Sequence, residues 1–441
     1  MTETGNAYVE RYPEWRDGLP GRGLAWLSKL RTEAFARFAE RGFPTRKTEA
    51  WKYTNLTPLT KRLFEPAAHP GKAETALPAG LPDETAAHRI VFVNGRPAAD
   101  GARLNALPEG VRLMTLGEAL EREPELLARH LSASVRPEEP ALFEMNTALM
   151  TEGAVLVLAP GVAMEKPVHL FFLTTDEAAD KAIYLRNLIV AGKGSRADVF
   201  ESYLGTGKAE YWMNVVTEIV AEEGAHLRHY KLQDEGKAAY HVAMTVAKIG
   251  DHASYDSFAM SRGSALARNE IQATLDGSGI DCRLNGIHLA RDRQHLDTTT
   301  VIDHAKPGSH CDETYKSVVD DHAETVFQGK IIVRPNAQKT EAHQMNRNLL
   351  LSDEARANTK PELRIHADDV QCSHGATVSE LDEQALFYLR SRGIAKEAAR
   401  SLLTEAFIAE TIDAIENAPV REAMRHAMAN WLGETSGMVQ A

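Results

Sequence analysis

A repeated alternation of short β-rich runs and turns, over about residues 154–369, constrains the fold more than any other feature of this sequence. Runs of about four to eight residues are separated by Gly or Asn turns, and no helix of ordinary length fits between them. Clear examples are Ala154–Leu158, Val168–Phe172, Asn187–Val190, Asn214–Thr217, Val326–Phe327 and Lys330–Val333. The pattern disfavours βαβ units and predicts an all-β domain.

Turn markers recur through this region at spacings of roughly 26 to 32 residues, which is typical of stacked solenoid coils. The markers are Gly194, Gly224, Gly250, Gly279, Gly308, Ala337 and Asp369. Three residues after each marker stand Ala197, Leu227, Ala253, Cys282, Cys311, Thr340 and Cys372, all small or apolar except Thr340. Equivalent positions of successive coils lie above one another, so we expect these residues to form an inward-facing column of a β-solenoid.

Helical periodicity marks both ends of the chain. Apolar residues recur at three- and four-residue spacing over residues 24–38, with Gly42 as a C-cap, and helical stretches follow over about 116–132. A linker rich in Pro, Ala and Gly covers residues 65–90 and leads into a short strand at 89–95. Three more helices are expected after residue 380, the third beginning near Pro419. We therefore divide the chain into a mostly helical N-terminal domain with its linker (1–150), a β core (151–377) and a C-terminal helical domain (378–441).

Composition argues against several classes of protein. The chain carries 62 acidic and 50 basic residues, a formal net charge of −12, which disfavours nucleic-acid or membrane-surface partners held by bulk charge. No apolar run approaches membrane-spanning length, and the first thirty residues lack a signal-peptide core. The three cysteines are far apart and form no CxxC motif, which argues against a disulfide framework or a structural zinc site. These features predict a cytoplasmic protein.

Common catalytic signatures are missing from the sequence. Gly205–Lys208 is a near match to a phosphate-binding loop, but it lacks the first glycine and the following Ser or Thr, so we expect no ATP site there. GxGxxG after a strand, HExxH and GxSxG motifs do not occur. The alternative to a non-catalytic protein is a β-helix polysaccharide-processing enzyme, which needs a cluster of carboxylates on one solenoid face. Asp292, Asp297, Asp303 and Asp312 are the candidates, but they follow no coherent register.

The segment 368–375 contains the strongest candidate site. Cys372 and His374 are two residues apart, so on a strand both side chains project to the same face. A thiolate and an imidazole suit iron, copper or an iron–sulfur species, although two ligands do not close a site. The alternative is that Cys372 fills the end of the core while His374 bonds to a backbone carbonyl. Core packing is the interpretation for Cys282 and Cys311, which stand in the small-residue column.

Other polar and apolar clusters remain open to two interpretations. His288, His295, His304, His310, His322 and His343 match no metal motif, and we interpret them as turn and surface residues rather than a shared metal face. The C-terminal apolar stripes either pack on each other and on the solenoid, or present anchors such as Phe387, Tyr388 and Phe407 to a partner.

Two long segments, Ile365–Thr377 and Leu386–Ile394, give the sequence a specific likeness to known proteins: it resembles the SufB/SufD family. Asn348–Ser352 and Pro361–Leu363 also look like family segments. Pro44, followed by Glu49–Leu56, is typical of the SufD branch, as is the Cys-Ser-His sequence of residues 372–374.

This resemblance implies a right-handed parallel β-helix flanked by helical domains, in a non-catalytic scaffold subunit of the SUF iron–sulfur cluster assembly complex. A SufB-type paralogue would join through the β-helix ends. A SufC-type ABC ATPase would bind the C-terminal helices, for which we expect contacts from Leu386, Phe387, Tyr388, Arg390, Arg392 and Phe407.

The resemblance also implies roles for the candidate site. His374 and its neighbour Cys372 would bind iron or a transient iron–sulfur cluster shared with the partner, whether to build the cluster, hold it or supply iron. Flavin is associated with such complexes, although we assign no flavin site to this chain. The open solenoid ends predict a homodimer when the chain is alone. A SufB-like homodimeric scaffold is a third alternative, against which the Cys-Ser-His sequence argues.

Overall fold

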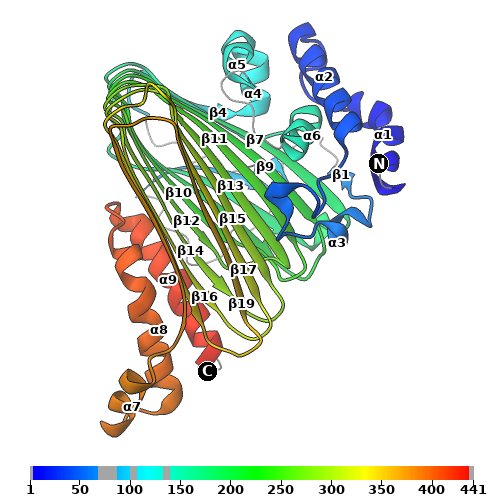
Figure 1. The fold of residues 1–441 in the computed structure, drawn as a ribbon. Coiled ribbons are helices and arrows are strands. Elements are labelled where there is room, and N and C mark those ends of the chain that lie inside the picture. Colours follow the sequence, from blue (N-terminus) through cyan, green and yellow to red (C-terminus); the bar gives the residue numbers. More distant parts are fainter. Residues whose placement is uncertain (1–2, 68–86, 100–106, 133–139, 437–441) are drawn as a thin grey trace.

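The computed structural model describes residues 3–67, 87–99, 107–132 and 140–436, and its centre is a two-sheet β-solenoid (Figure 1). From residue 154 onward, successive strands alternate between the two sheets, so that each strand pairs in parallel with the strand two places along the chain. Two pairs nearer the N-terminus are antiparallel instead: His88–Val93 with Arg96–Pro97, and Val111–Thr115 with Ala154–Leu158. The predicted β-solenoid with helical regions at both ends is confirmed. An early strand such as β5 (Ala154–Leu158) is buried on both faces and reads as a continuous apolar run, whereas a later strand such as β18 (Thr340–Leu350) alternates buried and more exposed residues.

The first sheet, called sheet 1, runs in the order β19, β17, β15, β13, β11, β9, β7, β5, β4, with β1 also paired to β7. Its strands are β1 (Glu65–Pro66), β4 (Val111–Thr115), β5 (Ala154–Leu158), β7 (Lys181–Ala191), β9 (Trp212–Ala221), β11 (Tyr240–Ile249), β13 (Leu266–Leu275), β15 (His295–His304), β17 (Glu324–Val333) and β19 (Arg356–Ile365).

The second sheet, called sheet 2, runs in the order β20, β18, β16, β14, β12, β10, β8, β6, β2, β3. Its strands are β2 (His88–Val93), β3 (Arg96–Pro97), β6 (Val168–Thr175), β8 (Arg196–Thr206), β10 (His226–Asp234), β12 (Ser254–Ser261), β14 (Asp281–Ala290), β16 (His310–Val319), β18 (Thr340–Leu350) and β20 (Val370–Glu380). The predicted strand at 89–95 thus becomes the first parallel partner of β6.

The inward-facing column exists, but two of its predicted members are wrong. Tyr255 and Ala342 stand where Ala253 and Thr340 were expected. The complete column is Ala197, Leu227, Tyr255, Cys282, Cys311, Ala342 and Cys372. The error has a backbone cause: the left-handed turn residue of these two coils is not Gly250 or Ala337 but a non-glycine residue two places later, His252 (φ 55°) or Lys339 (φ 58°).

Left-handed residues set the phase of the coils. Gly194, Gly224, Gly279 and Gly308 all have φ between 65° and 73°, and each precedes its column residue by three positions. Glycine adopts this region without a steric cost, which is why it marks most of the turns. The same rule holds for the two exceptional coils once their non-glycine residue is counted as the marker.

The solenoid lumen holds an apolar core that is interrupted by buried polar groups. Apolar side chains from both sheets form one large cluster along it. Within this core, the Glu201 carboxylate accepts hydrogen bonds from Tyr203 (2.7 Å) and Thr217 (2.8 Å), and it lies 3.1 Å from His229. Burial of such groups requires partners, and these contacts supply them.

The N-terminal helices cover the outer face of sheet 1. They are α1 (Glu3–Arg16), α2 (Ala25–Arg41), η1 (Glu49–Trp51), α3 (Thr57–Thr60), α4 (Leu116–Arg122), α5 (Pro124–His130) and α6 (Ala141–Leu149). The predicted helix over 24–38 corresponds to α2, whose C-cap is Gly42 with φ 71°. Trp51 and Phe38 belong to a buried cluster that includes Trp212 of sheet 1. Most of the expected linker, residues 68–86, lies outside the described residues.

The C-terminal helices lie along the outer face of sheet 2, on the other side of the solenoid (Figure 1). They are α7 (Glu383–Ser391), α8 (Lys396–Asp413) and α9 (Ala418–Ser436). Ile408 of α8 and Met424, Met428 and Trp431 of α9 pack against apolar residues of sheet 2 such as Phe258. Of the two interpretations of these apolar stripes, packing on the solenoid therefore holds for α9 and for much of α8. In the described parts of the chain, no helix is long and apolar enough to cross a membrane.

Candidate site at the open end of the solenoid

The two last strands of the solenoid leave its C-terminal end open. β19 pairs only with β17, and β20 pairs only with β18, so each has an outer edge without a strand partner among the described residues. Exposed apolar side chains lie on these strands, namely Ile365 (39 % exposed) and Val378 (48 %). Unpaired edges with apolar side chains are suited to receive another chain.

Cys372 and His374 both stand on the edge strand β20. The pairing of β20 with β18 brings Cys372 beside Ala342 and His374 beside Gln344. Cys372 is half-buried against the end of the lumen core, and its partial burial raises the pKa of the thiol. His374 is exposed and makes no hydrogen bond to a described residue, so the bond to a backbone carbonyl that the alternative interpretation expects is not formed within the described parts of the chain. The expected shared face of these two residues follows from their spacing on the strand.

Two polar side chains on the two preceding coils, Gln344 and Glu313, stand in the same lumen column as His374. Gln344 is the neighbour of His374, and Glu313 is the neighbour of Gln344 on the next coil. Gln344 Nε2 donates a hydrogen bond of 2.6 Å to the Glu313 carboxylate. Burial raises the pKa of Glu313 to about 7, an effect that hydrogen bonds oppose. Sequence reasoning missed this pair because only the coil register reveals that both residues face inward beneath His374.

The open end does not contain a complete metal site. Among the described residues, no group of three or more His, Cys, Asp or Glu side chains is arranged to hold a metal ion. Cys282 and Cys311 are fully buried neighbours in the lumen, and burial raises the pKa of both thiols. Their expected role in core packing agrees with this position. Cys372 and His374 alone are therefore an incomplete ligand set for a metal ion.

The other histidines are dispersed over the molecule. His288 and His304 are buried on inward-facing positions, whereas His295 lies on the outer face of sheet 1. His310 and His343 lie together on the outer face of sheet 2, with ring centres 6.3 Å apart. The interpretation of the set as turn and surface residues is therefore wrong for His288 and His304, because the coil register directs both side chains into the buried lumen.

The four carboxylates considered for a polysaccharide enzyme do not form a catalytic group. Each has a separate polar partner: Asp292 pairs with Lys237, Asp297 with Arg268 and Asp303 with Arg334, while Asp312 lies 2.8 Å from the His310 ring. Asp297 is also fully buried, and Thr54 donates a hydrogen bond to it. Carboxylates of glycoside hydrolases instead face each other across an open groove.

The near match to a phosphate-binding loop is filled by the protein's own carboxylate. The backbone N–H groups of Lys208 and Ala209 both donate hydrogen bonds of 2.8 Å to Asp176 Oδ1. A Cβ atom on Gly207 would lie 2.2 Å from the same oxygen, so the turn is closed around Asp176. This arrangement agrees with the expectation that Gly205–Lys208 does not bind nucleotide phosphates.

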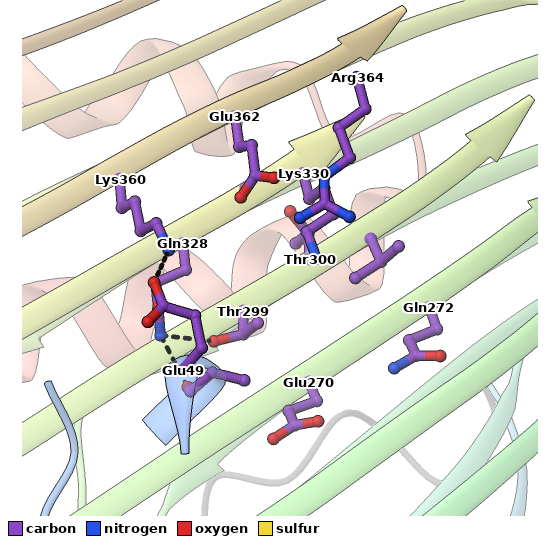
Figure 2. Close-up of a pocket in the computed structure, with 13 residues that line it drawn as sticks. Glu49, Glu270, Gln272, Thr299, Thr300, Gln328, Lys330, Lys360, Glu362 and Arg364 are labelled. Carbon is purple, nitrogen blue, oxygen red and sulfur yellow. Dashed lines mark hydrogen bonds and ion pairs between the residues drawn. The ribbon is translucent and has the colours of Figure 1, made fainter. Parts of the chain in front are cut away.

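A groove of about 290 Å³ lies on the outer face of sheet 1, between η1 and the edge strand β19. Figure 2 shows Lys360 of β19 paired with Glu49 of η1, and Gln328 bonded to Thr299 across the groove floor. Arg364 is likewise paired with Glu362. Because these charges neutralise one another, we assign no ligand to the groove.

The residues expected to contact a partner ATPase separate into two groups. Phe387 (75 % exposed) and Tyr388 (57 %) project from α7, where Arg390 and Arg392 are also exposed and Leu386 is half-buried. Arg392 lies over the Tyr388 ring, with its guanidinium 5.2 Å from the ring centre. Phe407 instead packs toward sheet 2, where Lys316 Nζ donates a hydrogen bond of 2.9 Å to its carbonyl oxygen. Exposed aromatic side chains on a short helix are suited to a protein contact.

Comparison with known proteins identifies the family. Residues 172–407 match the model of the SufBD core domain of the SUF iron–sulfur cluster assembly system, and residues 2–170 match the SufBD N-terminal region. The chain belongs to the SufBD family. A SufBD family protein of Synechocystis sp. is 33 % identical over 87 % of this chain and 86 % of its own length. The iron–sulfur cluster assembly protein SufD of Escherichia coli is 30 % identical over 86 % of this chain and 87 % of its own length. A chloroplastic protein of Arabidopsis thaliana is 28 % identical over 91 % of this chain and 85 % of its own length.

Membership of the SufBD family confirms the resemblance carried by residues 365–377 and 386–394. It also gives the family segment Glu49–Leu56 a structural explanation. Trp51 packs on Arg268, and Thr54 reaches His295 (2.9 Å), so the segment attaches the N-terminal region to the solenoid.

Proposed function

We propose that this SufBD family member is a non-catalytic scaffold subunit that holds iron or a nascent iron–sulfur cluster at the open end of its solenoid. The observation that supports this most directly is the incomplete ligand pair. Cys372 and His374 share one face of an edge strand, and no third ligand side chain among the described residues joins them. A second β-helical subunit of the SufB type, joined through the edges of β19 and β20, would supply the remaining ligands. The metal or cluster is cargo in this proposal, and it stays only transiently.

A second surface supports a role in a larger assembly. The aromatic side chains of α7 face solvent, whereas the apolar residues of α9 pack against sheet 2. We propose that α7 receives an ABC-type ATPase of the SufC type, with Phe387 and Tyr388 as anchors. ATP hydrolysis would then belong to the partner. Three free cysteines suit a reducing compartment, and we expect the complex to act in the cytosol.

The test of the ligand assignment is His374→Ala in a complex reconstituted with SufB-type and SufC-type subunits, a sulfur donor and iron. We expect assembly and ATP hydrolysis to persist while cluster formation, followed by visible absorbance, falls at least tenfold. His343→Ala is the matched control, because His343 is exposed on the outer face of the neighbouring strand, where its ring contacts Ser373 and His310 of sheet 2. An undiminished cluster yield in His374→Ala would reject His374 as a ligand.

A further inference from the structure

The amide of Gln344 is held in one orientation by Glu313, its neighbour on the preceding coil. Its Nε2 donates to the Glu313 carboxylate, and above its pKa of about 7 this carboxylate is ionised and only accepts hydrogen bonds. The reverse orientation would bring the amide oxygen against the carboxylate oxygen. Glu313 therefore selects the orientation in which the Gln344 amide nitrogen points toward the preceding coil.

The space for this amide is provided by a glycine. A Cβ atom on Gly329 would lie 2.1 Å from Gln344 Nε2 and 2.7 Å from the ring of Phe327. Any larger residue at this position would displace the amide. Gly329 has an ordinary backbone conformation, so the close approach rather than the turn geometry requires glycine here.

The other end of the same amide lacks a partner. Gln344 Oε1 is buried and accepts no hydrogen bond from a described residue. On the next coil, at the lateral spacing of about 4.8 Å between paired strands, stands His374, which also has no hydrogen bond among the described residues. An imidazole carries one N–H in its neutral form, and this is the donor that the buried oxygen lacks.

We propose that Glu313 and Gln344 are positioning residues for His374: Glu313 orients the Gln344 amide, whose oxygen accepts the N–H of the His374 ring. This fixes the ring tautomer and leaves the lone pair of the other ring nitrogen for iron. A second hydrogen bond of this kind normally accompanies a metal-binding histidine. The use of the second nitrogen for iron rests on the function proposed above, whereas the hydrogen bond itself does not.

The test is the tautomer of His374, measured from its ring ¹⁵N chemical shifts in the full-length chain without metal, at a pH of about 8, where Glu313 is mostly ionised. The His374 signal is identified by its loss in His374→Gln. In the native chain we expect one neutral tautomer to dominate. Gln344→Met removes the amide with little change of volume, and the tautomer populations should then shift toward those of a free imidazole. Gln371→Met, on β20 like His374 but directed outward, should leave the tautomer populations unchanged.

Glu313→Gln provides a second variant. The new amide can donate as well as accept hydrogen bonds, so it no longer forces the Gln344 amide into one orientation. We expect a shift in the same direction but smaller than in Gln344→Met. Tautomer populations that match the native chain in either folded variant would overturn the proposal. Thermal melting identifies a variant that fails to fold, and the other variant then decides the question.

Cluster formation separates this inference from the proposed function. If His374 binds iron, Gln344→Met should lower the yield of the reconstituted complex by about tenfold or more, in the range typical of lost outer hydrogen bonds. If His374→Ala leaves cluster yield intact while Gln344→Met still changes the tautomer, the ligand role fails and the hydrogen bond stands.

Discussion

The guanidinium of Arg268 lies 4.0 Å from the centre of the Trp51 ring, and this contact joins the N-terminal segment to the outer face of sheet 1. Arg268 is fully buried and also pairs with Glu270 at 2.7 Å and with Asp297. The indole face thus stacks on a buried cation, an arrangement that stabilises both side chains.

Trp51→Ala should therefore lower the free energy of unfolding by about 3–5 kcal/mol, because it removes a buried aromatic ring and uncovers Arg268. Urea unfolding followed by circular dichroism measures the change. Trp26→Ala is the matched control, since Trp26 is only partly buried, and its loss should be clearly smaller. Equal losses in both variants would contradict a special role for the Trp51 contact.

Removal of the exposed aromatic rings of α7 should abolish binding of the ATPase without loss of stability. Phe387 and Tyr388 are mostly exposed, so the double change Phe387→Ala with Tyr388→Ala removes little buried area. We expect affinity for the ATPase, measured by calorimetry, to fall at least a hundredfold, as for paired interface anchors. Glu405→Ala, at an exposed position of α8, should bind as the native chain does. Unchanged affinity in the double variant would exclude α7 as the docking helix.

The lumen cysteines should be dispensable for cluster formation. Cys282 and Cys311 are fully buried, and burial raises the pKa of both thiols, so neither offers a reactive thiolate. Cys282→Ala and Cys311→Ala should each cost roughly 1 kcal/mol of stability and leave cluster yield at the native level. Cys372→Ala, assayed alongside, should reduce the yield. Loss of yield in a stable Cys282 or Cys311 variant would give these thiols a role in sulfur or iron transfer.

Buried histidines should make the protein sensitive to acid. Burial lowers the pKa of His169 to about 3 and those of His288 and His304 to about 4, against about 6.5 in an unfolded chain. The unfolded state therefore binds protons first, and the stability contributed above pH 6.5 is lost progressively as the pH falls toward 4.

The unfolding free energy should drop by about 1–2 kcal/mol per buried histidine between pH 7 and pH 5. His288→Gln should flatten this dependence, because glutamine keeps the volume and a hydrogen-bonding group beside Thr298. His343→Gln, at the surface, should leave the slope as it is. Urea titrations at the two pH values measure both, and an unchanged slope in His288→Gln would contradict the assignment.

The β-solenoid and its flanking helices were predictable because local patterns carry them. Coil length follows from recurring turn residues, and α2, α8 and α9 follow from the spacing of their apolar residues. Gly42 marks the end of α2, and Pro419 marks the beginning of α9. The Cys372–His374 pair was predictable for the same reason, since alternate residues of a strand share a face. In each case the information lies within a few consecutive residues.

The sequence by itself determined the strand-rich coils, the helical ends and the candidate ligands on one strand. Only the tertiary structure decided which residues stand next to one another on neighbouring coils. His252 and Lys339 shift the phase of their turns, so that Tyr255 and Ala342 enter the column. The same lateral pairing aligns Glu313 and Gln344 with His374, residues separated by about thirty positions along the chain. Such alignment depends on the summed lengths and backbone conformations of the intervening turns, and a one-residue change would direct each side chain to the opposite face.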